Sequence, residues 1–342
     1  MSEPLVSICT PTYHRPELLR RAIASCRAQT YSNFEIVITD NSENDASREL
    51  VASLPEPRIR YFKNETNIGN LANIRKVGSL ARGKYMIVLM DDDLLQPEAL
   101  ALMVAAFEKH PTVGVVMAPM ALIDADDRRI YPYFYLIRKM YYRYRYQVGD
   151  GLVERRRVLK EFLVRDYPCC VPSGIMYRTE AFQQAGGFDL AGDFALDLDL
   201  AMRLAVHYDF YYVDRVLSAF RYTPISLTST MHTRGSDVGV FYRITRRILA
   251  DPAALALYPP TEHARLIRDS IYFCTCRALL NGLAGLRARN FAIIMETVRL
   301  IFREDPYLWN KLRLPCFVLR EILISFRPPA RPLPPEDVFR VA

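Results

Sequence analysis

Several features that identify common protein classes are missing from this sequence of 342 residues. No apolar run reaches the roughly 18 to 20 residues that a membrane span needs. The most apolar late stretch, residues 314–326, is interrupted by Arg320 and Glu321. Near the start, Glu3 and Pro4 stand where a secretory leader has basic residues before an apolar segment, so no leader is expected. The sequence therefore predicts a protein that is not integral to a membrane.

Cysteine and glycine motifs are scarce as well. The seven cysteines include no CxxC pair and no matched Cys and His spacing, which argues against a zinc site and against a disulfide framework. There is no Walker-type loop, no GxGxxG and no DxDxT motif, which disfavours a phosphoryl-transfer enzyme and a dinucleotide oxidoreductase. This cysteine usage is typical of a protein in a reducing cytoplasm.

The composition is that of a folded globular protein, and its charge is unevenly distributed. Half of the residues are apolar and a quarter are charged, with only 14 Gly and 22 Pro, so disorder and low complexity are excluded. Residues 231–342 carry 17 Lys and Arg against 10 Asp and Glu, whereas the first 230 residues carry 28 of each, and the net charge is +7. A neutral body predicts no nucleic-acid partner, and any anionic partner is expected at the basic last third.

Apolar runs and helical repeats alternate through the first 120 residues. The pattern predicts strands at 5–10, 34–39, 59–62, 85–90 and 113–117, and helices at 16–29, 45–54, 70–81 and 97–110. Each strand is a continuous apolar run, which is typical of a parallel sheet that is covered on both faces. The predicted fold class is therefore α/β, a Rossmann-like, mostly parallel sheet flanked by helices.

The rest of the chain changes character twice. Residues 130–146 are rich in Tyr and Arg with partial alternation, which favours a half-buried hairpin or, alternatively, a ledge that stacks sugars. Helices are expected at 238–249, 262–280, 290–302 and 308–326, followed by an extended Pro-rich tail at 327–342. We therefore predict a domain at 1–230 and a basic helical C-terminal region at 231–326.

Acidic residues directly follow two of the predicted strands. Asp40 follows the strand EIVIT, and Asp91, Asp92 and Asp93 follow the strand YMIVLM. Ligands of an open parallel sheet bind at the carboxyl ends of the strands, and three adjacent carboxylates need a cation or donors to offset their repulsion. Oxygen ligands without nearby His or Cys favour Mg²⁺ or Mn²⁺. A solvated acidic turn that caps the helix at 97–110 is the alternative.

A second acidic group lies in the segment AGDFALDLDLAMRLA. Leucines repeat every four residues from Leu196 to Leu204, which predicts a helix that begins near Asp193 and buries its leucine face. Asp197 and Asp199 then lie near the start of this helix. They are either a general base that faces the metal site or charges that complement the helix N-terminus.

These residues carry a resemblance to a known family. The segments VSICTPTYHRPELLRRAIASCRAQTYSNFEIVITDNS, NETNIGNLANIRKVGSLARGKYMIVLMDDDLLQPEAL and EAFQQAGGFDLAGDFALDLDLAMRLA resemble the opening, the DXD-type metal strand and the ED-type acceptor motif of family 2 glycosyltransferases. The resemblance covers about residues 5–222. It implies a GT-A catalytic domain at 1–230, with a nucleotide-binding half (1–120), an acceptor-binding half (121–230) and a C-terminal helical extension.

The resemblance also implies roles for single residues. It assigns nucleotide binding to Pro11, Thr12, Tyr13, Arg15, Asp40, Asn67, Arg75, Asp91 and Asp92. It assigns the metal, Mn²⁺ or Mg²⁺, to Asp92 and Asp93, and the catalytic base to Asp197, with Asp199 as the second choice. Asp40 matches the carboxylate that accepts the N–H of the base, a contact that favours uracil or thymine.

The function expected is metal-dependent, inverting transfer of a single sugar from a UDP- or TDP-sugar to a hydroxyl acceptor. The acceptor is expected to be a glycan or a lipid-linked sugar in bacterial surface glycan synthesis (O-antigen, capsule or exopolysaccharide). The QxxRW pattern of processive synthases is missing, and the one Trp is Trp309, which favours single transfer. A catalytically silent GT-A module that binds nucleotide or a partner is the alternative, because Leu196 replaces the usual Glu.

The basic C-terminal helices leave three interpretations open. They could hold a cytoplasmic enzyme against the anionic inner face of the membrane, pack as a homo-oligomer interface, or form a solvated helical cap.

Overall fold

Strands and helices alternate in the computed structural model, which describes residues 3–130, 149–164, 172–222, 239–287, 291–307, 310 and 313. The first strands are β1 (Val6–Thr12), β2 (Phe34–Asp40), β3 (Ile59–Lys63), β4 (Tyr85–Val88), β5 (Leu94–Leu95), β6 (Val113–Met117) and β7 (Met120–Ile123). The first helices are α1 (Pro16–Arg27), α2 (Ala46–Ser53), α3 (Asn70–Ser79) and α4 (Ala99–Lys109). Every strand and helix predicted in the first 120 residues is confirmed, with ends within two residues of those expected.

The later elements are mostly helical. They are β8 (Gly151–Val153), α6 (Arg155–Val164), the 3-10 turn η1 (Pro172–Gly174), β9 (Ile175–Arg178), α7 (Thr179–Gln184), the 3-10 turn η2 (Leu190–Ala195), α8 (Leu196–His207), β10 (Asp209–Tyr212), β11 (Ser218–Arg221), α10 (Val240–Leu249), α11 (Pro252–Ala256), α12 (Pro260–Arg287) and α13 (Phe291–Glu304). The helices predicted at 238–249, 262–280 and 290–302 correspond to α10, α12 and α13. The predicted hairpin, the predicted last helix and the Pro-rich tail lie almost entirely outside the described residues.

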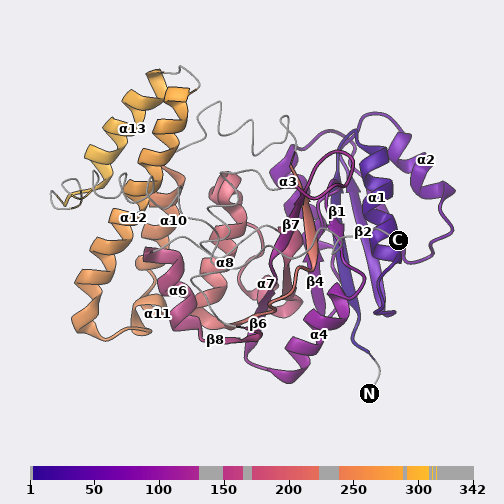
Figure 1. Cartoon of the computed structure of the whole chain (residues 1–342), viewed down its shortest axis with the longest axis horizontal. Helices are drawn as coiled ribbons and strands as arrows, with labels where there is room; N and C mark the ends of the chain where they lie inside the picture. Colours follow the sequence, from indigo (N-terminus) through magenta and orange to yellow (C-terminus); the bar gives the residue numbers. More distant parts are fainter. Residues whose placement is uncertain are drawn as a thin grey trace.

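In the described ranges, the strands form a large and a small sheet. The large sheet has the order β3-β2-β1-β4-β9-β6-β10-β8, and the small one has the order β5-β11-β7. β1 is parallel to β2 and β4, and β2 is parallel to β3, so the carboxyl ends of these strands lie at one edge (Figure 1). Within the large sheet, β9 is antiparallel to both of its neighbours and β8 is antiparallel to β10. The predicted α/β class with a mostly parallel sheet is confirmed.

Alternate residues of the central strands supply two different cores. Ile8 and Ile38 belong to the core shared with α1 and α4, whereas Cys9 and Val37 belong to the core shared with α3 and α8. Since both faces of these strands are buried, the strands show no polar alternation in the sequence.

The C-terminal helices share a core with the α/β part of the chain. Phe241 of α10 and Ile271 of α12 lie in the same buried cluster as Leu200 of α8. Figure 1 shows α10, α12 and α13 beyond α6 and α8, at the end of the molecule away from β2. Within the described part of the chain, no helix has both the length and the apolar character that crossing a membrane requires.

Candidate functional site

Most of the predicted nucleotide-binding residues lie where β1, β2 and β4 end. The register of β1 and β2 places Pro11 beside Thr39 and Thr12 beside Asp40. Thr12 is buried, and Tyr13, which follows β1, is exposed. Because the three strands are parallel, the acidic turn after β4 comes to the same edge as Thr12 and Asp40.

Asp91 is buried, and its carboxylate contacts Thr12 at the end of β1 and Arg15 in the turn that follows. Thr12 Oγ1 donates to its Oδ2 at 2.7 Å, and Arg15 Nη1 lies 3.5 Å from its Oδ1. Burial, followed by the charge of Asp92, raises the pKa of Asp91 to about 7. A cation bound at this turn would stabilise the ionised form.

Asp92 is the carboxylate of the turn that remains open to solvent, with 19% of its side chain exposed. Arg15 Nη1 lies 2.8 Å from its Oδ2, and its backbone carbonyl accepts a hydrogen bond from Arg221 Nε at 2.9 Å. Burial raises the pKa of Asp92, whereas the charges of Arg15 and Arg221 lower it.

The donor chemistry of the turn fits a divalent cation that is shared with a substrate. Mg²⁺ is commonly held by one or two carboxylates together with waters and phosphate oxygens, and Asp91 and Asp92 offer such carboxylates at an accessible edge. No group of three or more His, Cys, Asp or Glu side chains in the described ranges is arranged to hold a metal ion. A cation here would therefore complete its coordination with waters or with oxygens from a substrate.

Asp93 is fully buried and contacts the protein through both carboxylate oxygens. Its Oδ2 accepts the Ser173 hydroxyl at 2.5 Å, and its Oδ1 accepts the backbone N–H of Arg221 at 2.9 Å. Ser173 Oγ accepts the N–H of Met90 at 3.1 Å. Burial and the charge of Asp92 raise the pKa of Asp93 well above its usual value. Asp93 thus fastens the acidic turn to η1 and β11.

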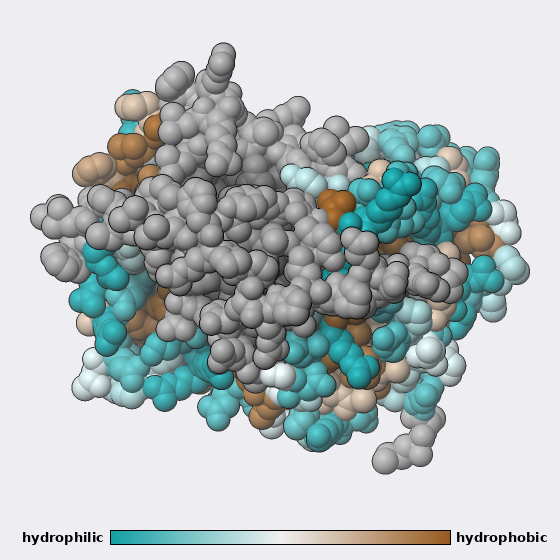
Figure 2. All heavy atoms as spheres, in the orientation of Figure 1, coloured by the Kyte–Doolittle hydropathy of each residue, from teal (hydrophilic) through white to brown (hydrophobic). Residues whose placement is uncertain are grey.

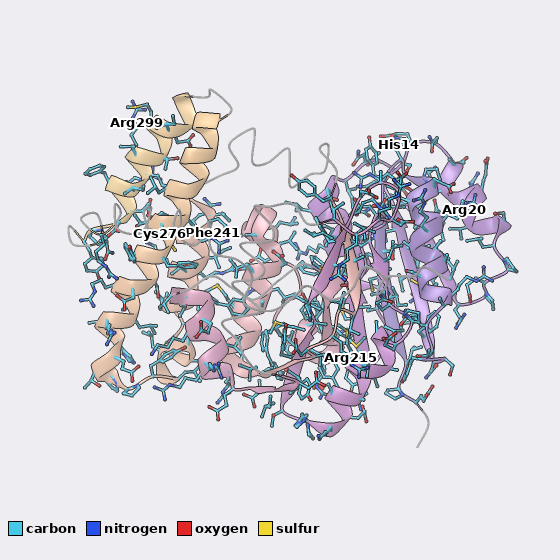
Figure 3. All side chains as sticks on the ribbon, in the orientation of Figure 1. His14, Arg20, Arg215, Phe241, Cys276 and Arg299 are labelled. Carbon is cyan, nitrogen blue, oxygen red and sulfur yellow. The ribbon has the colours of Figure 1, made fainter. Side chains whose placement is uncertain are left out.

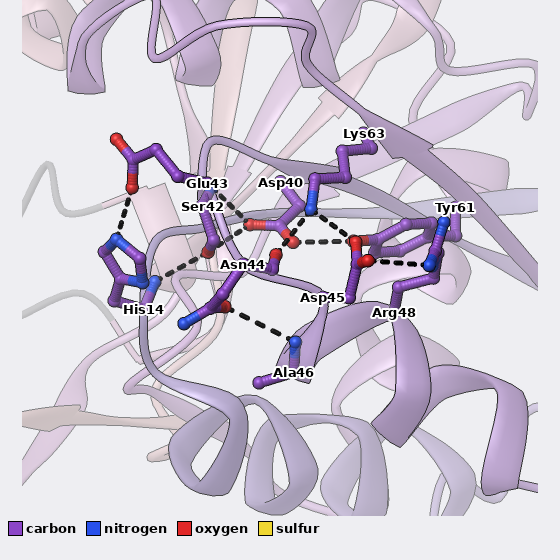
Figure 4. A network of polar contacts seen from close by, with 10 residues as sticks. All are labelled: His14, Asp40, Ser42, Glu43, Asn44, Asp45, Ala46, Arg48, Tyr61 and Lys63. Carbon is purple, nitrogen blue, oxygen red and sulfur yellow. Dashed lines mark hydrogen bonds and ion pairs between the residues drawn. The ribbon is translucent and has the colours of Figure 1, made fainter.

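Asp40 ends β2 at the centre of the polar network in Figure 4. Its Oδ1 accepts the N–H of Ser42 at 2.8 Å and the Ser42 hydroxyl at 2.5 Å, and its Oδ2 accepts the Tyr61 hydroxyl at 2.6 Å. Ser42 Oγ also accepts the N–H of His14 at 2.8 Å, which joins this network to the turn after β1. These donors hold the carboxylate of Asp40 in place as an acceptor.

Asn67 and Arg75, which the resemblance places over the base, are both exposed. Asn67 Oδ1 accepts the N–H of Gly69 at 2.9 Å, and Arg75 lies on the surface of α3. Gly69 has a φ of 84°, a conformation that favours glycine. The loop before α3 thus has a fixed local shape beside the strand ends.

Two buried asparagines that the sequence interpretation did not single out stabilise the same edge. Asn73 Nδ2 donates to the carbonyl of Thr39 at 3.1 Å, and Asn64 Nδ2 donates to Asn73 Oδ1 at 3.0 Å. Lys76 Nζ donates to Asn64 Oδ1 at 2.5 Å. The available signal was Asn73 itself, a polar residue on the buried face of a predicted helix.

Arg221 ends β11 and is buried against the back of the acidic turn. Its guanidinium contacts the carboxylate of Asp127 and donates to the carbonyls of Asp124 and Asp92. Arg21 of α1 lies 3.2 Å from the other Asp127 oxygen. This network joins α1, the loop after β7 and the turn.

Asp197 lies in the first turn of α8 and is partly exposed. Its Oδ1 accepts the N–H of Leu198 at 2.8 Å. Burial raises the pKa of Asp197 to about 7, and the charge of Arg277 on α12 acts in the opposite direction. A carboxyl group with a pKa near neutrality suits a general base at physiological pH. The contribution of Arg277 from the C-terminal helices had no signal in the sequence.

Asp199, the second choice for the base, is fully buried and is held by two arginines. Its Oδ2 accepts from Arg203 Nε at 2.9 Å, and its Oδ1 contacts Arg247 of α10. Arg203 also donates to the carbonyl of Gly187 at 2.7 Å. Asp199 therefore joins α8 to α10. The side chain of Asp193 lies outside the described part of the chain.

The site can now be set beside known proteins. Residues 7–186 match the family model described as glycosyl transferase family 2. The chain belongs to this family.

Solved structures support the fold of this family 2 glycosyltransferase. S. aureus TarS 1–349 in complex with UDP-GlcNAc superposes with a TM-score of 0.57 at 15% identity, covering 89% of this chain and 93% of that chain. The mannosyltransferase PcManGT from Pyrobaculum calidifontis, in complex with GDP-Man and Mn²⁺, gives a TM-score of 0.56 at 16% identity, covering 95% of this chain and 86% of that chain. These similarities show a GT-A fold, as predicted.

Curated relatives of this glycosyltransferase include proteins of polysaccharide biosynthesis. An uncharacterized protein of Mycobacterium tuberculosis is 26% identical over 302 residues, which are 85% of this chain and 92% of that protein. The putative colanic acid biosynthesis glycosyl transferase WcaA of Escherichia coli is 37% identical over 106 residues, or 30% of this chain and 38% of its own length. The succinoglycan biosynthesis protein ExoO of Rhizobium meliloti is 34% identical over 130 residues, or 37% of this chain and 36% of its own length.

Proposed function

We propose that this glycosyltransferase is metal-dependent and inverting, and that it transfers a single sugar from a UDP- or TDP-sugar to a hydroxyl acceptor. The observation that carries the proposal is the acidic turn. Asp91 and Asp92 are desolvated at the edge where Asp40 also lies, and the guanidinium in contact with their carboxylates is that of Arg15. This excess of negative charge favours Mn²⁺ or Mg²⁺ together with an anionic donor.

In this proposal, different residues at the strand ends recognise different parts of the donor. Asp92 would hold the cation, which when bound supplies charge stabilisation for the diphosphate as the sugar C1–O bond breaks. Asp91 would contact the ribose, and the exposed ring of Tyr13 offers a face for the base. Asp40 accepts from Ser42 and Tyr61 and would accept the N–H of uracil or thymine on the same carboxylate. We assign Asp93 to holding the turn, because its two oxygens tie the turn to Ser173 of η1 and to the backbone of Arg221 at the end of β11.

Asp197 is the proposed general base. It would take the proton of the acceptor hydroxyl while that oxygen forms a bond to C1 and the nucleoside diphosphate leaves from the opposite face with the bonding electron pair. The anomeric centre is thereby inverted. Its raised pKa supports this role, and the two arginines that bind Asp199 disfavour the second choice.

The names of two relatives support the proposed class of acceptor. Colanic acid and succinoglycan biosynthesis are the processes named for WcaA and ExoO. We propose that the acceptor here is likewise a glycan or a lipid-linked sugar of a bacterial surface polysaccharide.

The surface of α13 supports contact with the membrane that would carry a lipid-linked acceptor. Met295, Val298 and Phe302 are 54%, 41% and 69% exposed and recur at helical spacing. Arg299 and Arg303 are exposed beside them. Figure 2 shows hydrophobic residues at the surface over α13, at the upper left. An apolar helix face with flanking arginines is typical of an interfacial helix, so we propose a cytoplasmic enzyme at the inner face of the membrane.

A donor hydrolysis screen tests the proposed reaction. The purified protein is incubated with UDP-, TDP- and GDP-sugars in Mn²⁺ or EDTA, and release of the nucleoside diphosphate is measured. We expect Mn²⁺-dependent release from a UDP- or TDP-sugar. The rate of release should fall by about 100-fold or more in Asp92→Asn, because this variant lacks the carboxylate that would hold the cation at the diphosphate. Glu49→Gln, an exposed carboxylate change on α2, should have no effect.

Three results would contradict parts of the proposal. Preference for GDP-sugars would contradict the role of Asp40, and activity that persists in EDTA would contradict the role of Asp92. A silent module would bind UDP in calorimetry while releasing product from no donor.

A further inference from the structure

Arg15 contacts both carboxylates on which the proposed metal site depends. Its Nη1 lies 2.8 Å from Asp92 Oδ2 and 3.5 Å from Asp91 Oδ1. On the basis of the proposed function, we propose that Arg15 is an exchangeable counterion of the acidic turn. It neutralises the turn before the donor binds, and it moves to the diphosphate of the donor when a divalent cation takes its place.

The placement of Arg15 suits such an exchange. Arg15 precedes Pro16, the first residue of α1, and 41% of its side chain is exposed. It reaches both carboxylates through one nitrogen, and its other guanidinium nitrogens have no hydrogen-bond partner in the described ranges. A partly exposed ion pair of this kind is held weakly. Arg221 is different, because it is buried and bound to one carboxylate and two carbonyls.

A divalent cation held by Asp92 would compete with Arg15 for that carboxylate. A metal–oxygen bond to Mg²⁺ is about 2.0 to 2.1 Å long, so a guanidinium left 2.8 Å from Asp92 Oδ2 would face a like charge at close range. Diphosphate oxygens, in contrast, match the planar fork of a guanidinium. Metal and diphosphate therefore both favour the same movement of Arg15.

Removing Arg15 should therefore change the affinity for the metal and the affinity for UDP in opposite directions. Without Arg15, the cation has no competitor at Asp92, so the metal alone should bind more tightly. The diphosphate loses a partner, so UDP should bind more weakly even when the metal is present. A residue with a purely structural role would weaken both ligands together.

Mn²⁺ binding in the absence of nucleotide tests the exchange. The signal of free Mn²⁺ in electron paramagnetic resonance gives its affinity, which should be about tenfold tighter in Arg15→Gln than in the wild type. Calorimetry with UDP at saturating Mn²⁺ should show about tenfold weaker binding in Arg15→Gln and a smaller loss in Arg15→Lys.

Arg20→Gln is the matched control. Arg20 lies on α1 with its side chain exposed, and it pairs with Glu17 at 3.3 Å. Figure 3 shows that it lies away from His14, which is at the edge of the site. The variant removes the same charge from the helix that directly follows Arg15 and should leave both affinities unchanged. Thermal unfolding verifies that each variant is folded.

The outcomes separate the inference from the proposed function. Unchanged or weaker Mn²⁺ binding in Arg15→Gln, or an equal change in Arg20→Gln, would overturn the exchange and leave the proposed function standing. If UDP binding by the wild type were indifferent to Mn²⁺, the proposed metal site would fail together with the inference.

Discussion

Two aspartates of the same helical turn have opposite surroundings. Asp199 is bound by Arg203 and by Arg247, which lies 48 residues away in the sequence, whereas Asp197 accepts a hydrogen bond from the N–H of Leu198. The motif DLD contains both carboxylates, and the resemblance alone assigned the base to Asp197 and made Asp199 the second choice. The contact of Asp199 with Arg247 of α10 is a tertiary feature that no local pattern displays.

The pH profile of sugar transfer tests the proposed role of Asp197. The base must be ionised, and burial raises its pKa to about 7, so the rate should rise with pH through about 7 and level off above about 8. Asp197→Asn should remove this acidic limb and lower turnover by about 10²- to 10⁴-fold, while UDP binding measured by calorimetry stays unchanged. Equal losses of turnover and UDP affinity would indicate a structural role instead.

Arg277 provides a second test through the electrostatics of the same carboxylate. Its positive charge lowers the pKa of Asp197, so Arg277→Gln should raise that pKa and move the acidic limb to higher pH. The midpoint of the limb is the quantity to measure, since Arg277 also packs 4.2 Å from the centre of the Phe241 ring. Arg265→Gln, an exposed change on the same helix, should leave the midpoint in place. An unmoved midpoint in Arg277→Gln would refute the coupling.

At the scale of secondary structure, strongly periodic elements were predictable from the sequence. The first helices and strands have buried faces that local patterns reveal, and their strand ends correctly placed the carboxylates of Asp40 and Asp91 at one edge. The insertion of β9 between β4 and β6, and the pairing of β5, β11 and β7, were not predictable, because they depend on which distant segments meet. β4 ends at Val88, two residues before the predicted end of this strand at residue 90. Beyond it, the N–H of Met90 donates to Ser173, which lies 83 residues away in the sequence.

The link between η1 and the acidic turn can be measured through Ser173. Its hydroxyl donates to Asp93 and accepts from Met90, so Ser173→Ala leaves two buried polar groups without this partner. We expect the free energy of unfolding, measured by urea denaturation, to fall by about 1 to 3 kcal/mol. Ser79→Ala removes an exposed hydroxyl that donates to the carbonyl of Lys76, and it should change stability by less than about 0.5 kcal/mol. Equal stability of the two variants would contradict an anchoring role for Ser173.

At the scale of the whole molecule, α13 and the proposed donor site lie at different ends. Arg299 on α13 lies across the molecule from His14, which follows β1 (Figure 3). This arrangement would let one end contact a lipid surface while the strand-end edge stays accessible to a donor from solution.

Sedimentation with phosphatidylglycerol liposomes tests the proposed membrane contact. Binding should be present at low salt and weaken at high salt, because an electrostatic contact is screened. The double change Met295→Ser and Phe302→Ser should reduce binding at both salt concentrations, since it removes the exposed apolar face. Leu152→Ser, a change of an exposed apolar residue outside α13, is the control. If the wild type binds no liposomes but forms dimers, and the double variant does not form them, the exposed face of α13 is a contact between two copies of the chain.

The place of β9 has a consequence for synthesis on the ribosome. β4 and β6 lie on either side of β9, so the edges that face β9 stay unpaired until residue 178 has emerged. At typical rates of translation, the interval between the ends of β6 and β9 lasts on the order of 3 to 12 s. Unpaired strand edges are templates for wrong pairing. The nascent chain therefore passes through a period in which these edges are exposed and chaperones can act on them. A fragment that stops at residue 120 lacks β9, so its β4 and β6 edges would stay unpaired.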